Sequence, residues 1–568
     1  MSDPAANPTT PPTSFKVLIR VLVASAAHAG LMLLAFPPWN LWWLIFIAPT
    51  PLIIAATSPC RFRWIATLLF LPMVGTWLIH QWWVREVSAA GLLPMAAYLA
   101  AWTPLTGWAI ARMARSRRFS TWPFLVVVPI VWTGIEFLRA TFVLDGYPWY
   151  LLGQPLVEWL PLAQAADIGG LTLLAILPAM TGGLLADLIL HRQVASKAWR
   201  NGGLAAAVVA VWVGYGALRL ARTPEPIPGP TILAIQTNLP QSNKVAWTAQ
   251  QQWRDAIGFA RDTVSAFRQA TEQGERIDLV AWPETMLPGV GLEPASTATM
   301  QDAGWWPGTR FADLALELQE TLGVPLLLGS GSYEGLRIIG QGEQSRLEWE
   351  RRHNSVYLLD EQGVETTKRY DKVFLTPFGE RMPYISAWPW LEQRLLDLGA
   401  SGMSFDLNPG GRPVLLEYQP RDGEVIRIGT PICFEDTVPR ACSDLVWQDG
   451  RKTASVLVNA SNDGWFGDSR GPRATHLQLA RFRSIENRVP MVRVVNTGTS
   501  AWIDSSGRIR SSCRPMDPGW LVARTELDDR RPLFASIGQW PSGMLAVTAG
   551  ILLILAIRDR PDTKSRNP

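Results

Sequence analysis

The sequence has few of the residues that metal centres and disulfide scaffolds require. Its 568 residues include four cysteines, at positions 60, 433, 442 and 513, and five histidines that lie far apart. Four cysteines are too few to cross-link a chain of this length, and no CxxC pair or histidine cluster has the spacing of a zinc site. The sequence also lacks a GxSxG elbow and a phosphate-binding glycine loop. We therefore expect no metal ion and no cofactor.

Charged residues are scarce in the first two fifths of the chain. Residues 1–221 contain 14 Lys and Arg and 7 Asp and Glu, whereas the remaining 347 residues contain 79 charged residues. The second density is typical of a soluble domain, and the first is far below it. The charged part has no basic run, which argues against a nucleic-acid partner. A single soluble domain is therefore excluded, and the composition predicts a membrane region followed by a soluble region.

Apolar stretches recur at the length that a bilayer-spanning helix needs, about 17–25 residues. The expected spans are residues 17–36, 41–57, 65–84, 89–111, 122–143, 167–190 and 203–220, with an eighth at 542–557. The first has no convincing cleavage site, which favours a retained anchor over a signal peptide. We expect four parts: a cytoplasmic tail (1–16), seven transmembrane helices (17–221), a catalytic domain (222–534), and a last transmembrane helix with a cytoplasmic tail (535–568).

Lysine and arginine are concentrated in alternate loops, which by the positive-inside rule lie in the cytoplasm. These residues are Arg61, Arg63, Arg112, Arg115, Arg117, Arg118, Arg192, Lys197 and Arg200, followed in the tail by Arg558, Arg560, Lys564 and Arg566. The domain at 222–534 then lies on the outer face, and both termini are cytoplasmic. Four charged residues lie within or beside spans, where a functional role and pairing at helix ends are equally good interpretations: Arg20, Glu136, Arg139 and Asp187.

Short apolar or β-branched runs alternate with polar helical patterns between residues 222 and 534. The expected strands are 231–236, 279–282, 325–329, 355–359, 425–429, 455–459 and 491–496, and the expected helices are 248–273, 308–322 and 473–488. This alternation predicts an α/β domain with a largely buried sheet. The segment 333–352 is rich in Gln, Glu and Arg, and an exposed, solvated loop is its simplest interpretation.

Three reactive residues stand at or just beyond the ends of apolar runs. Glu284 lies in Trp-Pro-Glu-Thr, Lys372 in Tyr-Asp-Lys-Val-Phe, and Cys433 in Pro-Ile-Cys-Phe-Glu. A carboxylate can take the thiol proton, and an ammonium can stabilise the thiolate and the oxyanion of a tetrahedral intermediate, as nucleophilic acyl transfer requires. Taken singly, such a cysteine is usually a small buried apolar residue. The hypothesis therefore depends on all three residues together.

The strings around these residues carry a family resemblance. Their order resembles that of the nitrilase superfamily with its Glu-Lys-Cys triad, and the spans on both sides resemble the apolipoprotein N-acyltransferase family in particular. The matching strings are Trp282-Pro-Glu284, Tyr370-Asp-Lys372, Pro377-Phe-Gly-Glu-Arg-Met-Pro383 and Ile432-Cys-Phe-Glu435. Further matches are Glu136–Arg139 with Gly146-Tyr-Pro-Trp149, Gln236-Thr-Asn-Leu-Pro-Gln-Ser242, Asn459-Ala-Ser-Asn-Asp-Gly-Trp-Phe-Gly467, and Arg481 through Asn496-Thr-Gly498. Together they cover nearly the whole chain.

The resemblance implies an α-β-β-α sandwich on an eight-helix membrane domain in the bacterial inner membrane, with the catalytic domain in the periplasm. It implies the last step of lipoprotein maturation, in which an acyl chain passes from a phospholipid to the α-amino group of diacylglyceryl-cysteine. Phosphatidylethanolamine is the implied donor, a diacylated apolipoprotein the acceptor, and a monomer the active form. Cys433 is then the nucleophile, Glu284 the general base and acid, and Lys372 the oxyanion-binding group.

The resemblance also implies supporting residues. Glu380 is expected to orient Lys372 or Cys433, and Phe434 and Glu435 to shape the acyl site, while Trp247 and Trp465 are candidate substrate contacts. Two details depart from the family pattern. Phe434 stands where members often have tyrosine, and Trp247 lies two residues further along than in the usual string.

Three other functions remain open on the sequence. A membrane-anchored amidase or nitrilase would transfer the acyl group to water and act on a soluble amide. A transporter would show paired polar residues deep in several spans and symmetric helix repeats, and neither is clear. A catalytically inactive scaffold would not need an intact triad.

Overall fold

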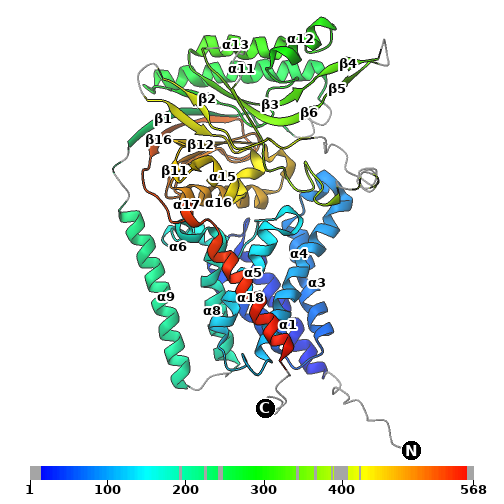
Figure 1. Ribbon diagram of the computed structural model, residues 1–568, viewed down its shortest axis with the longest axis vertical. Coiled ribbons are helices and arrows are strands. Elements are labelled where there is room, and N and C mark those ends of the chain that lie inside the picture. Colours follow the sequence, from blue (N-terminus) through cyan, green and yellow to red (C-terminus); the bar gives the residue numbers. More distant parts are fainter. Residues whose placement is uncertain are drawn as a thin grey trace, which may run out of the picture.

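Figure 1 shows the protein as a computed structural model in which a bundle of helices lies below two sheets and their covering helices. The structure describes residues 14–190, 195–222, 225, 227–240, 247–340, 345–361, 363, 368–385, 388, 390, 394, 407–420 and 424–559. Several expected features lie outside these residues: most of the N-terminal tail, Arg192, the end of the string Gln236–Ser242, part of the segment 333–352, and Arg560, Lys564 and Arg566 in the C-terminal tail.

Six helices in the described part of the chain are long and apolar enough to cross a membrane. They are α1 (Phe15–Ala35), α3 (Phe62–His80), α5 (Phe124–Thr141), the segment Leu171–Ile189 that ends in α8 (Ile176–Ile189), α9 (Ala195–Ala221) and α18 (Trp540–Arg558). Each corresponds to one of the eight expected spans. The apolar stretches of the sequence, five in the first region and one after the charged region, therefore predict these six helices correctly.

The other two expected spans have a different form. Residues 41–57 contain a 3₁₀ turn, η1 (Trp42–Phe46), and a nine-residue helix, α2 (Pro49–Thr57), because a proline starts a helix more readily than it continues one. Residues 89–111 lie within the long helix α4 (Val84–Ala114), which is interrupted by a non-helical Ser88. Neither is among the six helices above, so length and apolarity alone do not establish eight spans.

The chain between α5 and α8 forms short turns instead of a simple loop. These are η2 (Val143–Asp145), η3 (Gln154–Glu158), α6 (Leu160–Ala163), α7 (Ala166–Gly169) and η4 (Leu171–Ala175). Two of the charged residues noted in the sequence fix this segment: Glu136 accepts the Leu152 N–H at 2.9 Å, and Arg139 donates to the Trp149 carbonyl at 3.1 Å. We call residues 142–175 the platform, because the upper region is seated on it.

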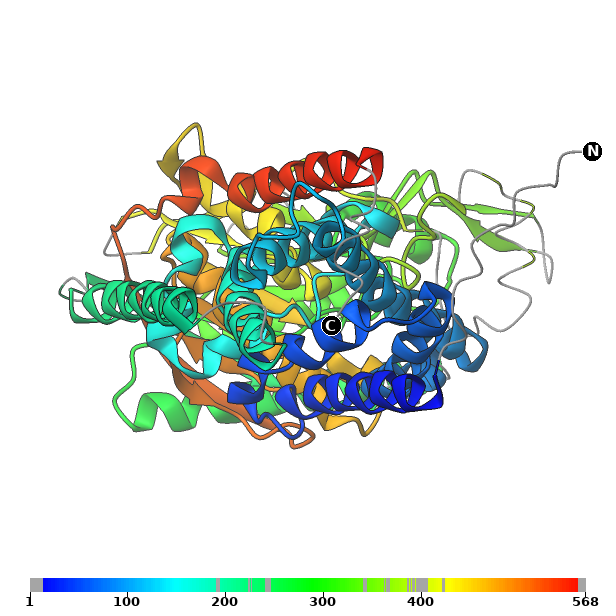
Figure 2. The same ribbon diagram turned by 90° about the horizontal axis from the view of Figure 1, so that it is seen from below.

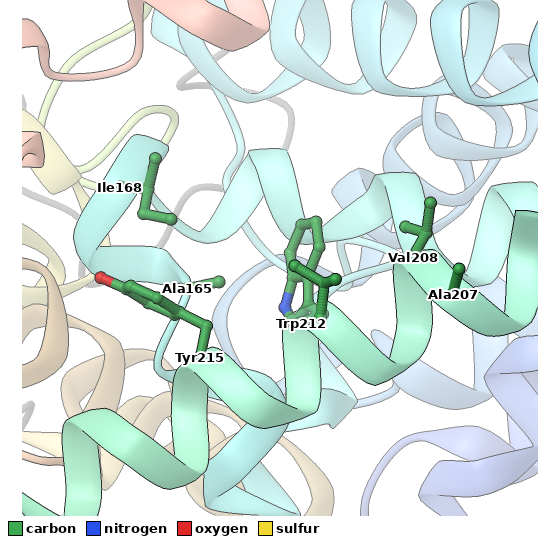
Figure 3. Close-up of a pocket in the computed structure, with 7 residues that line it drawn as sticks. Ala165, Ile168, Ala207, Val208, Trp212 and Tyr215 are labelled. Atoms are coloured by element: carbon green, nitrogen blue, oxygen red, sulfur yellow. The ribbon is translucent and has the colours of Figure 1, made fainter.

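The helix α9 stands at the side of the bundle, as the view from below makes plain (Figure 2). A cavity of about 360 Å³ lies between it and α7, with Trp212 and Tyr215 of α9 facing Ala165 and Ile168 (Figure 3). Near its outer end the helix is nevertheless attached, because the Tyr215 hydroxyl donates to Asp167 Oδ1 at 2.6 Å. The platform and α9 are thus joined by a polar contact beside an apolar cavity.

The upper region contains two six-stranded sheets. The first has the order β16-β1-β2-β3-β6-β7 and the second the order β15-β14-β13-β12-β9-β8. The first comprises β1 (Ile227–Gln236), β2 (Leu279–Ala281), β3 (Leu326–Glu334), β6 (Arg351–Leu359), β7 (Lys368–Asp371) and β16 (Gly519–Leu527). The second comprises β8 (Leu416–Tyr418), β9 (Ile426–Gly429), β12 (Val456–Ser461), β13 (Met491–Val495), β14 (Ala501–Ile503) and β15 (Ile509–Ser512). All seven expected strands are present, and the additional ones extend the sheets toward their edges.

The sheets pack face to face, and helices cover their outer faces (Figure 1). Between the sheets, apolar side chains such as Ile232, Leu279 and Leu358 meet Ile428 and Val458. Above the first sheet lie α11 (Ala249–Glu272), α12 (Pro294–Asp302) and α13 (Arg310–Leu322), and below the second lie α15 (Pro439–Val446) and α16 (Arg470–Asn487). This is the layer order expected for the sandwich.

The segment 333–352 is not simply a solvated loop, and that interpretation was wrong for its described residues. The neighbouring strands β3 and β6 extend into it, and β4 (Arg337–Ile339) pairs with β5 (Arg346–Glu348) in a small hairpin. Tyr333 and Trp349 pack with Val290 and Met300 in a separate apolar cluster. The polar composition of the segment gave no indication of these few apolar residues, which pack the hairpin against α12.

The helix α16 joins the two regions. Its apolar residues Leu479, Phe482 and Ile485 belong to the same core as the membrane helices. Its polar residues bind the platform: the Gln154 amide donates to Gln478 Oε1 at 3.0 Å, and the Leu171 N–H donates to Glu486 Oε1 at 2.8 Å. At its C-terminal end Arg488 donates to Asp167 Oδ2 at 2.5 Å. The upper region is therefore docked on the membrane helices through a buried, largely polar interface.

Candidate active site

Glu284 lies in the turn that follows β2 and is almost fully buried. Both carboxylate oxygens are held: the Asn354 side chain on β6 donates to Oε1 at 2.7 Å, and the Asn462 backbone N–H donates to Oε2 at 2.8 Å. Gly329 on β3 permits this turn, since a Cβ atom there would lie 2.7 Å from the Glu284 Cα. The carboxylate is therefore fixed in position by both sheets.

Lys372 follows β7 and is 1% exposed. Its Nζ lies 2.7 Å from Glu380 Oε2 and 3.8 Å from Glu284 Oε1. Burial disfavours the ammonium, but the two carboxylates together raise the pKa of Lys372 above its ordinary value, so the lysine is a cation. Burial likewise opposes ionisation of Glu380, and Lys372 and the Thr376 N–H outweigh it and lower the pKa of that carboxyl.

Cys433 begins the 3₁₀ turn η7 (Cys433–Thr437), directly after Ile432, which bridges to Ala460 of β12. Its φ of +49° lies in the left-handed region that few residues other than glycine adopt. Backbone strain of this kind is often found at functional sites. Burial and the Glu284 carboxylate raise the pKa of the Cys433 thiol well above its ordinary value, and Lys372 offsets them only in part. The resting thiol is therefore neutral, and forming the thiolate requires a base.

Glu435 links the loop that carries Lys372 to the turn that carries Cys433. Its Oε1 accepts the backbone N–H groups of Val373 at 2.8 Å and Phe374 at 2.9 Å, beside Lys372, while its Oε2 accepts the Ile432 N–H at 2.7 Å, beside Cys433. Burial raises the pKa of Glu435 to about 7 despite these donors. Glu435 was expected to shape an acyl site. Its hydrogen bonds instead show that it connects the loop after Lys372 to the residue before Cys433.

Asn354 is a site residue that the sequence patterns did not indicate. One Nδ2 group donates to Glu284 Oε1 at 2.7 Å and reaches Glu380 Oε1 at 3.2 Å, so it links the two carboxylates that flank Lys372. The available signal was an asparagine near the middle of a buried strand, where a polar side chain needs partners. That signal gives no indication of which partners, because they come from loops elsewhere in the sequence.

The three aromatic candidates lie in different surroundings. Phe434 is buried and belongs to the apolar core shared with the membrane helices. Trp247 packs against the core beneath α11 and donates its indole N–H to Asp255 at 2.8 Å. Trp465 is half-buried in the turn η8 (Asp463–Phe466), directly after Asn462. Of the three, Phe434 and Trp465 stand on the two turns that carry Cys433 and the Asn462 N–H.

One group of residues in the described part of the chain has the spacing of a metal site: Glu334, His353 and Asp371. Arg369 already occupies this group, with Nη2 2.7 Å from Glu334 and Nε 3.0 Å from Asp371. A guanidinium that neutralises both carboxylates removes the charge that would attract a cation. The cluster is therefore better described as an ion-pair network at the edge of the first sheet.

The arrangement as a whole suits acyl transfer through a thioester. A neutral thiol lies in the field of a fixed carboxylate, which can take its proton, and of a buried cation, which can stabilise negative charge on sulfur or oxygen. The site is enclosed by two sheets, so these charges act with little screening by water. Glu284, Lys372 and Glu380 converge as the sequence strings suggested.

Comparison with known proteins agrees with both regions of the chain. Residues 28–184 match the family model described as the apolipoprotein N-acyltransferase N-terminal domain, and residues 240–533 match the model described as carbon-nitrogen hydrolase. The second match alone spans more than half of the chain, and the two together join a membrane region to a hydrolase-type domain.

Several curated relatives match over nearly their full length. The apolipoprotein N-acyltransferase of Bradyrhizobium diazoefficiens is 30% identical over 566 residues, which cover 95% of this chain and 95% of the relative. The protein of the same name from Geobacter metallireducens is 29% identical over 553 residues, covering 94% and 95%. That from Vibrio cholerae is 27% identical over 516 residues, covering 88% and 90%. The similarity thus includes both regions and their connections.

Proposed function

The chain belongs to the apolipoprotein N-acyltransferase family, and from this premise we propose how its own residues carry out the reaction. The protein is an acyltransferase of the bacterial inner membrane that acylates lipoproteins, with membrane phospholipid as the other substrate. The observation that supports the residue roles is the buried cluster of Glu284, Lys372 and Glu380, whose charges act on Cys433.

In the first half-reaction, Glu284 takes the proton of the Cys433 thiol as the sulfur attacks the ester carbonyl of the phospholipid. A carbon–sulfur bond forms, and Lys372 stabilises the negative charge on the carbonyl oxygen. The carbon–oxygen ester bond then breaks, and Glu284 returns the proton to the departing oxygen. The products are a Cys433 thioester and a lysophospholipid.

In the second half-reaction, the α-amino group of diacylglyceryl-cysteine attacks the thioester carbonyl. A carbon–nitrogen bond forms and the carbon–sulfur bond breaks. Glu284 carries the proton from the amine to the sulfur, which restores the neutral thiol and leaves an N-acylated lipoprotein. Because one thiol serves both substrates in turn, the kinetics are of the ping-pong type. Glu380 keeps Lys372 charged and in place, and Glu435 holds the two loops in register.

The orientation follows from the loop charges. We place both termini in the cytoplasm and the domain at 222–534 in the periplasm, with eight crossings in which Trp42–Thr57 and α4 join the six long apolar helices. The domain is then tethered at both ends, by α9 and by α18. Both substrates are lipids, so a catalytic domain held against the bilayer has direct access to them.

The finer identities of substrate and assembly are parts of the same proposal. The donor is phosphatidylethanolamine, from which the sn-1 chain is taken, and the acceptor is a diacylated apolipoprotein. The active form is a monomer, and Trp247 and Trp465 contact substrate. A hydrolase acting on a soluble amide is the less supported alternative, since the relatives that cover both regions are named as acyltransferases.

A donor-only labelling experiment tests the central step. The purified protein in detergent is incubated with phosphatidylethanolamine labelled in its sn-1 chain, without acceptor, and the label is mapped. The proposal predicts a hydroxylamine-labile label on Cys433, with equimolar lysophospholipid. Labelling in the sn-2 chain instead is expected to leave the protein unlabelled.

Matched variants separate the catalytic cysteine from the others. Cys433→Ala removes the label while the protein still folds and inserts, and Cys513→Ala keeps it, because Cys513 lies at the end of the second sheet, just beyond β15. Transfer activity that persists in Cys433→Ala would overturn the assignment. Equally, hydrolysis of a soluble amide with no label from phospholipid would favour the amidase.

A further inference from the structure

A second buried charged cluster lies below the active site, in the part of the second sheet that faces the membrane helices. At its centre is His476 of α16, which is 1% exposed. Its Nε2 lies 2.6 Å from Asp436 Oδ1, and its Nδ1 lies 2.9 Å from Asp463 Oδ1. Arg493 of β13 completes the cluster, with Nε 3.3 Å from Asp436 Oδ2.

The two aspartates belong to the two turns that carry the catalytic groups. Asp436 is three residues after Cys433 in η7. Asp463 directly follows Asn462, whose backbone N–H holds Glu284 Oε2 at 2.8 Å. A single imidazole therefore bridges the turn of the nucleophile and the turn of the base. Arg493 of β13 reaches the same two aspartates less closely, with its Nη2 3.9 Å from Asp463 Oδ1.

A protonated His476 and Arg493 together match the two negative charges of Asp436 and Asp463. Two aspartates then face two cations, His476 and Arg493, while Arg473 on α16 lies close enough to Asp463 to affect it as well. Burial disfavours the imidazolium, but Asp436 and Asp463 raise the pKa of His476 to about 9. In turn, the pKa of Asp463 falls to about 2 despite its burial, chiefly because of His476.

Aromatic residues separate this cluster from the membrane region. The Trp149 ring of the platform lies 5.3 Å from the His476 ring, and Phe466 lies 6.1 Å from it. Phe466 also packs edge-on against Trp83, 5.0 Å away, just before α4. On the opposite side Gly498 leaves room for Asp463, since a Cβ atom there would lie 2.1 Å from Asp463 Oδ2. The cluster is thus enclosed on both sides.

We propose that His476 is a positioning residue that, as a cation shared by Asp436 and Asp463, sets the Cys433 turn against the turn that holds Glu284, and that Trp149 of the membrane region keeps this bridge dry. The inference rests on the proposed function. It gives the membrane region a part in the chemistry beyond anchoring, because the platform covers the bridge on which the distance between base and nucleophile depends.

Loss of the bridging cation has two consequences. The two turns lose the closer of their two common partners and keep only Arg493. Misplacement of reacting groups by about 1 Å can cost about 100-fold in rate. Asp463 also loses its nearest counter-charge, and Arg493 and Arg473 then compensate less fully for a carboxylate that already disfavours the Cys433 thiolate. Both effects slow formation of the thioester, whereas neither touches the lipid-facing surface, so the maximal rate falls and the donor concentration for half-maximal rate stays the same.

The first test measures single-turnover formation of the Cys433 thioester from sn-1-labelled phosphatidylethanolamine in three proteins. His476→Gln keeps hydrogen-bonding capacity but removes the charge, and we expect its rate to fall about 10–100-fold. His28→Gln changes a histidine of α1 that is hydrogen-bonded to the Ala48 carbonyl, and serves as the matched control with an unchanged rate. Thermal unfolding of each protein shows whether it is folded.

Restoring the charge balance distinguishes positioning from simple packing. In the double variant His476→Gln/Asp436→Asn one anion is removed along with the cation, and we expect the rate to recover at least tenfold over the single variant. The pH profile gives a second readout. The positive charge of His476 is fully present below its ordinary pKa of about 6.5 and is lost as pH rises through about 9. The rate of thioester formation by the wild-type protein is therefore expected to fall as pH rises through 9. This alkaline limb of the pH profile is expected to be absent in His476→Gln.

A further variant moves Asp463 without altering His476. Gly498→Ala pushes a methyl group toward Asp463 Oδ2 and is expected to slow thioester formation while the alkaline limb remains. The proposal is overturned if His476→Gln keeps the wild-type rate, if its rate falls with an unchanged pH profile and no recovery in the double variant, or if Gly498→Ala is as fast as wild type. If the wild-type protein forms no thioester at all, the proposed function fails instead, and the two failures are distinguishable.

Discussion

The helices α11 and α16 cover the outer faces of the two sheets, but in opposite surroundings. In α11 only six of 24 residues are buried, and they form one apolar stripe against the first sheet. In α16, 15 of 18 residues are buried, and they include three arginines, a glutamate and a histidine. Both sequences are polar, so polarity alone does not report exposure. What differs is the partner: water for α11, and the platform and catalytic turns for α16.

The two surroundings give charged residues on the two helices different contributions to the free energy of unfolding. Charged residues on α11 are solvated and can change at little cost, because exposed ion pairs contribute about 0–1 kcal/mol. Those on and beside α16 are desolvated, so each must have a counter-charge or a hydrogen bond. The contrast predicts effects that differ by an order of magnitude between the two helices.

The largest effect is expected where α16 meets the platform. Asp167→Asn leaves Arg488 buried without its counter-charge, and removing one partner of a buried ion pair costs about 3–5 kcal/mol. The apparent unfolding temperature of the detergent-solubilised protein measures this loss. Adding Arg488→Met to Asp167→Asn removes the unpaired charge, and the double variant is expected to recover much of the stability. Failure to recover would show that the pair acts through geometry and not through charge.

A pH-dependent effect is expected at Glu486 on α16. Burial raises the pKa of Glu486 to about 7, although Arg483 and the Leu171 N–H favour the anion. The native state therefore binds a proton more tightly than the unfolded chain, so this carboxyl makes stability fall as pH rises from about 4.5 through 7. The full contribution is about 3 kcal/mol at most. Thermal unfolding of Glu486→Gln from pH 4.5 to 8 is expected to lack this part of the decline.

A smaller effect is expected at the start of α11. Thr248 and Gln251 form a capping box, in which the threonine hydroxyl accepts the Gln251 N–H at 3.3 Å and the Gln251 side chain accepts the Thr248 N–H at 3.1 Å. Thr248→Ala is expected to cost about 1 kcal/mol. Urea titration followed by intrinsic tryptophan fluorescence measures this loss, and Thr248→Ser, which keeps the cap, is the control. Equal losses in both variants would contradict the cap.

The smallest effect is expected in the middle of α11. Arg261 and Asp262 form an ion pair at 3.5 Å with both side chains largely exposed. Arg261→Ala is therefore expected to change the free energy of unfolding by less than about 0.5 kcal/mol, as the same urea titration would measure. A loss of 2 kcal/mol or more would mean that the outer face of α11 is covered by a partner.

The sequence predicts α11 better than it predicts α16. Both helices are expected from their patterns, at 248–273 and 473–488, and both are present. The apolar stripe of α11 also indicates its buried face, because water covers the rest. The burial of α16 could not be predicted, because its partners, such as Asp167 and Gln154, lie more than 300 residues away in the sequence.

The candidate site shows the same limit. The sequence indicates Glu284, Lys372 and Cys433 as candidates because each stands in a distinctive local string. Asn354 and His476 were not found, because their roles depend on groups that only the folded chain brings within 3 Å. The expected membrane spans agree with the structure where apolar runs are continuous. They differ at residues 41–57, where Pro49 starts the short helix α2, and at residues 89–111, which form part of the longer helix α4.

The ion pairs of Asp167 also have an order in time. Arg219, 52 residues later, donates to Asp167 Oδ2 at 2.8 Å, and Arg488 is 321 residues later. A ribosome adds about 5–20 residues per second, so Arg219 is synthesised about 3–10 s after Asp167, and Arg488 about 16–64 s after it. During synthesis of the catalytic domain, Arg219 is the earlier of the two cations and neutralises the carboxylate. Arg219 of α9 is thus available as a counter-ion for Asp167 of the platform before α16 and Arg488 have been synthesised.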